Sequence, residues 1–354
     1  MNARRTGTYR LRGWKAPTIG AAVAAVIAVL LLPTITAGFG STVARTGPTD
    51  HRFAVLGHSK AGGTLSSCGV GGYPSFLGYD SVNHYMYVPN QLGGNVSVVA
   101  SPCKVVGTVK LPVNADPVAV AFCPQNDYMY VVDTNLNQVY VVSKFTVVST
   151  ISGGHFNTPD AIAWDPGDSI MLVANFGWSN LTAVRGTSYY GSLAVGDQPD
   201  SIVYDPYYNT LLVENFGSLN ITIIPSATYP FTTPYTNTTY AGGEEGMVFD
   251  PADDYDYVAD PSYGTVSILT GTGTYLGYVT VGKGPIWVAF DQSTLTVFVT
   301  NEASHSVWSI SGSTVVKKYI LPVGDQPFGI AYSDYATHIY VTVISPGSQL
   351  VELN

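Results

Sequence analysis

Short apolar runs separated by turn residues fill most of the chain, and they recur in a fixed order. A first run commonly follows a proline, as in PDAIAWDP from Pro159. A second run ends in Asn or Asp, as in LVAN at Asn175, a third begins six residues later at Leu181, and a fourth, such as YLGYVTV at 275–281, closes the unit. Runs of this length, rich in Val, Ile and Tyr and bounded by Gly, Pro, Asn and Asp, predict β-strands. The pattern therefore predicts four strands per unit.

The first run occurs seven times at nearly constant spacing. Its copies start at Pro74, Pro117, Pro159, Pro199, Glu244, Pro285 and Pro327, which are 43, 42, 40, 45, 41 and 42 residues apart. Four short strands repeated every 42 residues or so are typical of the blade of a β-propeller. We therefore predict an all-β, seven-bladed β-propeller of four-stranded antiparallel blades, preceded by one N-terminal hydrophobic helix.

The last copy lacks its fourth strand, because the chain stops after three strands at 350–354. Aligning the segment before Pro74 with the segment before Pro285 places Thr64–Val70 where the fourth strand of another unit lies. We expect Thr64–Val70 to complete the seventh blade beside Leu350–Leu353 and close the ring, since an open ring would leave an unpaired edge. The propeller then spans residues 64–354.

The repeated phrases resemble those of a known family. P-x-x-[IV]-A-[FWY]-D-P, [YF]-V-[TA]-N and N-x-[TS]-x-V are similar to the repeats of the YVTN family, propellers that include many archaeal and bacterial surface proteins. The resemblance covers about residues 64–353 and implies the same fold and a place at the cell surface. Propellers host unrelated chemistries, so the function has to be argued from the site.

The N-terminus predicts export. Residues 1–16 carry five cations and no acid, as a cytoplasmic flank does, and residues 17–40 are apolar and free of charge. This stretch is long enough for a retained transmembrane anchor or for the core of a cleaved signal peptide, and both place the rest outside the cell. Residues 41–63 form a linker, with a further edge strand expected at Phe53–Leu56.

The charge of the exported part narrows the partners. The whole chain has a formal charge of −9, and removing the five cations of residues 1–16 leaves −14. Nucleic acid is a poor partner for such a surface, because phosphate binding needs a basic face. A cell-surface protein, a glycan or a cation fits better.

Most repeated polar residues have a structural interpretation. Asn or Asp at the end of the second strand is expected to hydrogen-bond its own backbone into the turn, and Asp-Pro after the first strand is expected to end that strand. Four N-x-[ST] sequons occur, at Asn95, Asn180, Asn220 and Asn237. The first three share one repeat position, which a family turn explains without a sugar, although export permits glycosylation. Asn237 lies in the Tyr/Thr/Pro-rich insertion 225–240 and is expected in an exposed loop.

One group of acids suggests a cation site. The residue after the repeat proline opens the innermost strand at the mouth of the central channel, and there three consecutive copies carry Asp160, Asp200 and Glu245. Asp116 precedes the proline of the second copy. Carboxylates converging on one mouth could hold a hard cation such as Ca²⁺. The alternative is that an acid after proline only caps a solvated turn.

Neither the cysteines nor the histidines point to catalysis. Cys68, Cys103 and Cys123 match no zinc, haem or redox spacing, and export permits a disulfide. Cys103 and Cys123 are expected on the same face of neighbouring blades, so we favour the pair Cys103–Cys123. The histidines are scattered over the repeat, and only His155 is expected in a loop that borders the channel.

Two functional hypotheses follow from these residues. The first is a cell-surface binding or scaffold protein without turnover of its own. The second is an enzyme, because several propellers with the same number of blades are metal-dependent lactonases or lyases that act from the channel mouth. A set of metal ligands with a general acid or base on the axis would favour the enzyme. The acids here lie on one side only, so we favour binding.

Overall fold

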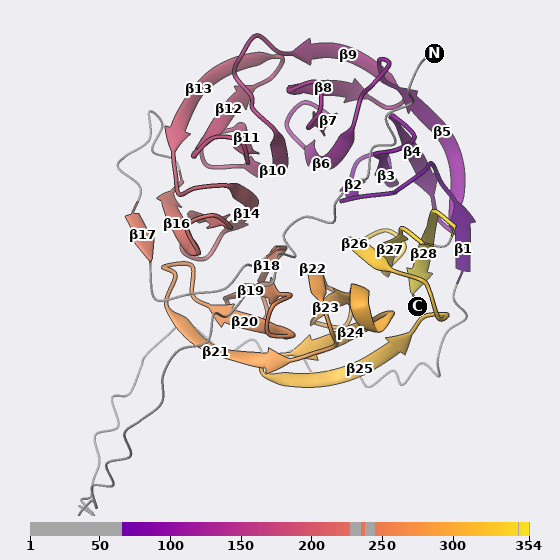
Figure 1. Cartoon of the computed structure of the whole chain (residues 1–354), viewed down its shortest axis with the longest axis vertical. Coiled ribbons are helices and arrows are strands. Elements are labelled where there is room, and N and C mark those ends of the chain that lie inside the picture. The colour runs from indigo at the N-terminus through magenta and orange to yellow at the C-terminus, as the bar shows by residue number, and fades with distance from the viewer. Residues whose placement is uncertain (1–65, 227–234, 238–244, 346, 354) are drawn as a thin grey trace, which may run out of the picture. The chain divides into compact units, whose positions relative to one another are not determined.

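The computed structural model describes residues 66–226, 235–237, 245–345 and 347–353, and all of its regular elements but one short 3-10 helix are strands. Seven four-stranded antiparallel sheets are arranged around a central axis (Figure 1). The fold is thus the predicted all-β seven-bladed propeller. The N-terminal flank 1–16, the apolar segment 17–40, the whole linker 41–63 with the strand expected at Phe53–Leu56, and residues 64 and 65 of the closing segment lie outside the described residues. Within the described part, no helix is long and apolar enough to cross a membrane.

Each blade runs from an inner strand at the axis to an outer strand at the rim. Blade 1 consists of β2 (Gly78–Asp80), β3 (Tyr85–Asn90), β4 (Asn95–Ala100) and β5 (Lys104–Lys110). Blade 2 consists of β6 (Pro117–Cys123), β7 (Tyr128–Asp133), β8 (Gln138–Ser143) and β9 (Thr146–Ile151). Blade 3 consists of β10 (Pro159–Asp165), β11 (Ile170–Asn175), β12 (Asn180–Arg185) and β13 (Ser188–Ala194).

The remaining blades repeat this order. Blade 4 consists of β14 (Pro199–Asp205), β15 (Thr210–Asn215), β16 (Asn220–Pro225) and β17 (Tyr235–Asn237). Blade 5 consists of β18 (Met247–Asp250), β19 (Tyr255–Asp260), β20 (Thr265–Leu269) and β21 (Tyr275–Thr280). Blade 6 consists of β22 (Pro285–Asp291), β23 (Thr296–Asn301), the helix η1 (Glu302–Ser304), β24 (Ser306–Ser311) and β25 (Thr314–Ile320). Blade 7 consists of β26 (Pro327–Ser333), β27 (His338–Val343), β28 (Gln349–Leu353) and β1 (Ser66–Gly69).

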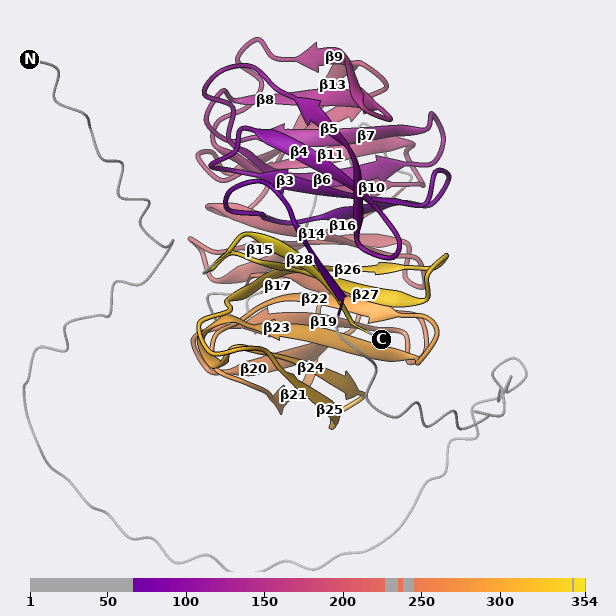
Figure 2. The same ribbon diagram turned by 90° about the vertical axis from the view of Figure 1, so that its right-hand side faces the viewer.

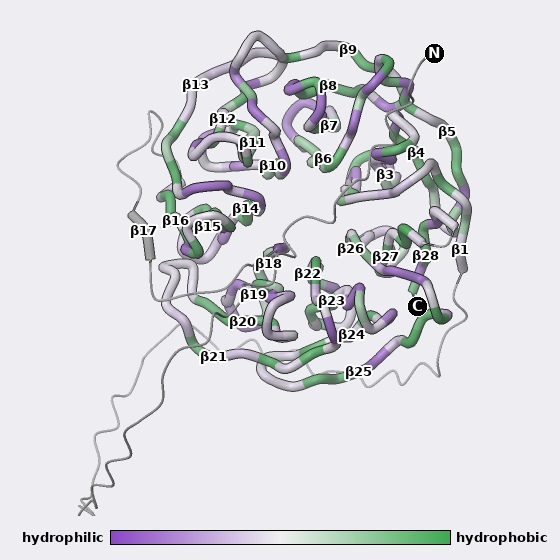
Figure 3. The backbone as a smooth tube through the Cα atoms, in the orientation of Figure 1, coloured by the Kyte–Doolittle hydropathy of each residue, from purple (hydrophilic) through white to green (hydrophobic). Residues whose placement is uncertain are grey.

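The hydrophobic core is divided among the junctions between blades. Each of the seven junctions has its own cluster of buried apolar side chains, such as Val118 and Tyr130 of blade 2 with Met171 of blade 3. In Figure 3 hydrophobic residues accordingly recur in every blade around the ring. Strands two and three of each blade are covered on both faces by neighbours, which explains why they are continuous apolar runs instead of alternating ones.

The repeated acids have the structural role that the sequence predicted, whereas the repeated amide of Asn175 bonds to other side chains and not, as predicted, to the backbone of its own turn. Asp205 ends β14, and its carboxylate accepts hydrogen bonds from the N–H groups of Tyr207 and Tyr208, at 2.7 and 3.0 Å. Asn175 ends β11, is fully buried and donates through its side-chain amide to Asn180 and Thr182 at 2.7 and 2.9 Å. The acid therefore shapes the turn, and the amide connects the end of the second strand to the side chains of the third.

The ring closes through the N-terminal strand, as predicted. Strand β1 pairs antiparallel with β28, with Ser66 opposite Glu352 and Cys68 opposite Leu350. Seen from the side in Figure 2, β1 and β28, although from opposite ends of the chain, lie next to each other. The seventh blade thus combines three C-terminal strands with one N-terminal strand, which leaves no open blade.

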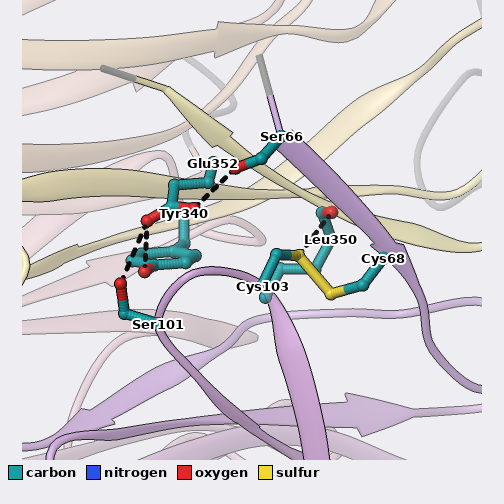
Figure 4. The surroundings of a disulfide bond; sticks show 7 residues. All are labelled: Ser66, Cys68, Ser101, Cys103, Tyr340, Leu350 and Glu352. Carbon is teal, nitrogen blue, oxygen red and sulfur yellow. Dashed lines mark hydrogen bonds between the residues drawn. A yellow bond between two sulfur atoms is a disulfide. The ribbon is translucent and has the colours of Figure 1, made fainter. Parts of the chain in front are cut away.

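The predicted disulfide Cys103–Cys123 is wrong. Cys68 of β1 is bonded to Cys103, with 5.5 Å between their Cα atoms, and Cys123 is a buried free thiol (Figure 4). Cys103 precedes the outer strand β5, whereas Cys123 ends the inner strand β6, so the two lie at opposite radial ends of their blades. The observed disulfide instead connects blade 7 to blade 1 across the ring closure.

Candidate axial binding site

The end of the propeller at which the inner strands begin is built by one repeated backbone contact. The residue before the repeat proline accepts a hydrogen bond from the residue that follows the second strand. Examples are Gln91 N–H to Tyr73 O, Thr134 N–H to Asp116 O and Glu302 N–H to Gly284 O, at 3.0, 3.1 and 2.8 Å. We call this inner edge the axial mouth. The contact fixes Tyr73, Asp116 and Glu302 at the mouth, on blades 1, 2 and 6.

Three aromatic rings from blades 1, 6 and 7 meet inside the ring. Phe76 stacks on Trp287 and on Phe328, with ring centroids 4.1 and 4.9 Å apart. Blades 1 and 6 are not neighbours, because blade 7 lies between them, so Phe76 and Trp287 can touch only near the axis. Tyr73 lies 6.3 Å from Phe328 in a tilted arrangement. We call Tyr73, Phe76, Trp287 and Phe328 the aromatic arc; all four are partly exposed.

The backbone leaves room for these rings at specific small residues. A Cβ on Gly246 would lie 2.5 Å from the Trp287 ring, so a larger residue there would displace the indole. The N–H of Gly246 also donates to Ile286 O at 2.8 Å, which holds blades 5 and 6 together beside the ring. Phe76 is held in the same way by its N–H bond to Val118 O at 3.1 Å. The arc is therefore fixed from both sides.

Acids occupy the mouth on blades 2 to 6. Asp160 and Asp200 directly follow the repeat prolines of blades 3 and 4 and are 6% and 7% exposed. Glu245 holds the matching place before β18 in blade 5, and Asp116 and Glu302 add one acid each from blades 2 and 6. We call these five residues the acidic arc. Blades 2 to 6 thus each supply one acid.

The predicted Ca²⁺ site of Asp116, Asp160, Asp200 and Glu245 is not assembled. Among the residues that the structure describes, no three His, Cys, Asp or Glu side chains are placed to hold a metal ion together. The physical reason is that a shared repeat position places one residue on each blade around the ring. A hard cation needs several oxygens converging on one point.

The electrostatics of the mouth link the two arcs. Burial raises the pKa of Tyr73, and the negative charges of Glu302 and Asp116 raise it further. Burial also raises the pKa of Glu302, which the charge of His305 partly offsets. The imidazole Nδ1 of His305 lies 2.8 Å from Asp325 O. The Tyr73 hydroxyl thus remains protonated in an acidic surrounding.

Other predicted site residues lie elsewhere. His155 was expected beside the channel, but its ring stacks at 3.8 Å on Tyr189 of the outer strand β13. The loop before β10 buries Phe156 in the core between blades 2 and 3, which directs His155 toward the rim. The expectation for His155 is therefore wrong.

The sequons fall into two groups. The side-chain oxygens of Asn95, Asn180 and Asn220 accept hydrogen bonds from the amides that end the preceding strands, at 2.8, 2.7 and 2.9 Å. These three asparagines are thus part of the turns. The backbone of Asn237 belongs to β17 and pairs with Ile221, so Asn237 is in an outer strand and not in a loop as expected.

The sequence prediction missed most of the aromatic arc, although a signal was present. Two residues after the start of each first run, blades 2 to 5 have Ala119, Ala161, Ser201 and Gly246, whereas blades 1 and 6 have Phe76 and Trp287. Comparing the residues at this repeat position would have shown that blades 1 and 6 differ from the others by carrying an aromatic ring. Glu302 had no such signal, because only the folded ring brings the turn after β23 to the axis.

Comparisons with known proteins support the fold. No protein-family model matches the chain, and no curated protein sequence is similar to it. The structure is similar to a streptogramin B lyase, with a TM-score of 0.71 and 13% identity over 82% of this chain and 98% of that one. It is also similar to virginiamycin B lyase from Staphylococcus aureus, with a TM-score of 0.71 and 12% identity over 82% of this chain and 99% of that one. A third similar structure is hydrazine synthase of Kuenenia stuttgartiensis, with a TM-score of 0.67 and 17% identity over 80% of this chain and 96% of that one. At these identities the likeness establishes the seven-bladed propeller alone.

Proposed function

We propose that the chain is an exported propeller of the YVTN repeat type that acts at the cell surface as a binding or scaffold protein. The observation that carries this proposal is the axial mouth, where an aromatic arc and an acidic arc face a common axis. Partly exposed rings beside charged groups are typical of recognition sites, because the rings supply contact area and the charges supply orientation.

The N-terminal sequence supports the location. The basic flank 1–16, followed by the uncharged stretch 17–40, has the charge asymmetry of a segment that leaves its basic end in the cytoplasm. The disulfide Cys68–Cys103 fits an oxidising compartment, because disulfides are rare in reducing cytosol. Both features agree with a propeller outside the cell.

The proposal is tested by binding of the full-length chain, purified in detergent and labelled, to cell envelopes from the source organism. Saturable binding is expected for the wild type. Glu302→Lys reverses one charge of the mouth and is expected to weaken binding at least about tenfold. Asp334→Lys, on an exposed turn at the opposite end of the propeller, is the matched control and is expected to bind like the wild type.

Two results would contradict the proposal. Equal binding by the wild type and Glu302→Lys would mean that the mouth takes no part. Metal-dependent turnover of a lactone or ester that is lost in the double variant Asp160→Asn, Asp200→Asn would favour an enzyme of the lactonase or lyase kind. The envelope experiment and the turnover experiment therefore separate the two functional hypotheses.

A further inference from the structure

The charges around the axial mouth are predominantly negative. The acidic arc supplies five acids, whereas the described cations lie elsewhere with one exception. Lys104, Lys110, Lys317 and Lys318 lie on the outer strands β5 and β25, and Lys144 and Arg185 lie at the β8–β9 and β12–β13 hairpins. The exception is Lys283, in the loop that leads into β22, where it is exposed. The field at the mouth is therefore negative, and it attracts positive groups.

The aromatic arc adds a second preference for positive groups. The face of an aromatic ring carries a negative quadrupole and attracts a cation within about 6 Å of its centroid. Of the residue types Trp, Tyr and Phe, Trp attracts a cation most strongly, and the arc contains Trp287, which is stacked with Phe76. Tyr73 contributes a ring on blade 1 beside Phe328. Rings and acids thus select for the same sign of charge at the mouth.

The kind of cation follows from the spacing of the acids. A metal ion of the Ca²⁺ type takes six to eight oxygens at short distance. The described residues gather no three acidic, histidine or cysteine side chains for that purpose. A methylated or alkyl ammonium group needs no such shell, because it is large and weakly hydrated and it binds through ring faces and through the field of carboxylates at longer range.

We infer that the axial mouth binds an organic ammonium group, seated against the aromatic arc and attracted by the acidic arc. The inference rests on the proposed function, since it names the chemical group by which the mouth recognises its partner. Glu302 is the acid best placed to act on it, because its N–H donates to Gly284 O in the loop that leads into the strand of Trp287, and its charge reaches Tyr73 on blade 1.

The test uses choline and its neutral isostere 3,3-dimethylbutan-1-ol, in which a carbon replaces the charged nitrogen. Each is titrated into the full-length chain in detergent at constant ionic strength, and binding is measured by calorimetry and by Trp fluorescence. Saturable binding of choline is expected, with at least about tenfold weaker binding of the isostere, because only choline interacts with the ring quadrupoles and the carboxylates as a charge.

Variants assign the binding to the mouth. Glu302→Gln keeps the size of the side chain and is expected to weaken choline binding about fivefold, and Trp287→Phe is expected to weaken it less, because Phe retains a ring face. Asp334→Asn and Trp308→Phe are the matched controls; Asp334 lies at the opposite end, and Trp308 lies on β24, the third strand of blade 6, away from the axis. Neither control is expected to change choline binding.

Three results would overturn the inference. They are equal binding of choline and the isostere, no binding of choline at concentrations up to about a tenth molar, and unchanged binding by Glu302→Gln and Trp287→Phe. The proposed function has its own readout. If envelopes still bind the wild type better than Glu302→Lys but choline does not compete, the proposed function holds and the ammonium inference fails.

Discussion

Two junctions of the ring handle buried carboxyl groups in opposite ways. At the ring closure between blades 7 and 1, Glu352 accepts hydrogen bonds from Ser66 and Tyr340, both at 2.6 Å (Figure 4). It also lies 2.7 Å from Nδ1 of His338. Burial alone would raise the pKa of Glu352, but these hydrogen bonds together lower it below its ordinary value. The buried carboxylate is therefore stable as an anion.

The junction between blades 4 and 5 brings two carboxyl groups together. Asp205 of β14 and Asp256 of β19 are both fully buried and interact with each other. No N–H or O–H group of the described residues donates to either oxygen of Asp256. Burial, followed by the charge of Asp205, raises the pKa of Asp256 well above its ordinary value. The pair is satisfied when one proton lies between the two groups.

The difference shows that donors, and not burial, decide what a buried acid does to stability. Glu352 is surrounded by donors and stabilises the fold in its charged form. Asp256 faces another acid, so ionising it costs stability. The same fold thus carries a junction that favours neutral pH and a junction that favours acidic pH.

The largest expected effect comes from the covalent connection at the closure. Cys68→Ser with Cys103→Ser removes the disulfide and is expected to lower the free energy of unfolding by about 2–5 kcal/mol, because the unfolded chain gains freedom. Denaturant unfolding of the full-length chain measures this loss. Cys123→Ser is the control, because Cys123 is a buried free thiol, and its expected loss is about 1 kcal/mol. Equal losses in both variants would show that the disulfide adds nothing to the closure.

A smaller loss is expected from one donor at Glu352. Tyr340→Phe removes the hydroxyl that donates to this buried carboxylate and is expected to cost about 1–3 kcal/mol. Tyr278→Phe, on the outer strand β21 with 60% of the residue exposed, is the control and is expected to be neutral. Thermal unfolding at pH 7 compares the two. If Tyr340→Phe leaves the stability unchanged, the hydrogen bonds to Glu352 do not stabilise its junction, and the difference from the junction of Asp205 and Asp256 is lost.

The acid pair predicts a pH dependence. An acid whose pKa is raised in the folded state contributes stability that is complete below its unfolded pKa, near 4, and is lost as the pH rises through the folded pKa. Asp256→Asn can donate to Asp205 without taking up a proton. The variant is therefore expected to be more stable than the wild type by about 1 kcal/mol above pH 7, and the difference should vanish or reverse near pH 4. The melting temperatures of the wild type and of Asp256→Asn are measured over this pH range. If the two depend on pH in the same way, the pair does not share a proton.

Asp250 sharpens the same comparison with a smaller effect. It ends β18 in blade 5, and burial is the largest cause that raises its pKa to about 7. Asp250→Asn should weaken the dependence of the melting temperature on pH between about pH 4 and 7, the window between the unfolded and the folded pKa. The matching acid Asp80, in blade 1, accepts three hydrogen bonds from the turn that follows it. Asp80→Asn is therefore the control, and an equally weakened pH dependence of the melting temperature in that variant would contradict the role of Asp250.

The sequence could predict the fold because its signal is local and repeated. The run from Pro159 to Asp165 is strand β10, and the closing strand could be placed by aligning Thr64–Val70 with another blade. Turn residues such as Asp205 could be assigned because an Asp bonds to the backbone two residues onward within the same turn. Each of these features can be recognised from a short run of residues that are close in the sequence.

The disulfide and the axial site could not be predicted in the same way. Cys68 and Cys103 meet only after the two ends of the ring have closed, and the repeat positions, although they place Cys103 beside an outer strand and Cys123 on an inner strand, do not show this contact. Phe76 and Trp287 touch across blade 7, a contact that exists only because the ring is closed. A repeat position gives the place of a residue on its blade, whereas the distance across the axis depends on the closure of all seven blades.

The closing disulfide also determines how the propeller carries a mechanical load. A pull on the N-terminal side of the chain enters at Ser66, and strand β1 has only four residues paired with β28. The force can strip no more than the two residues before Cys68, because Cys68 is bonded to Cys103 at the start of blade 1. Tension then passes into the blade that follows and bypasses the short strand. A force applied to the N-terminal side of the propeller therefore does not separate β1 from β28 at the ring closure.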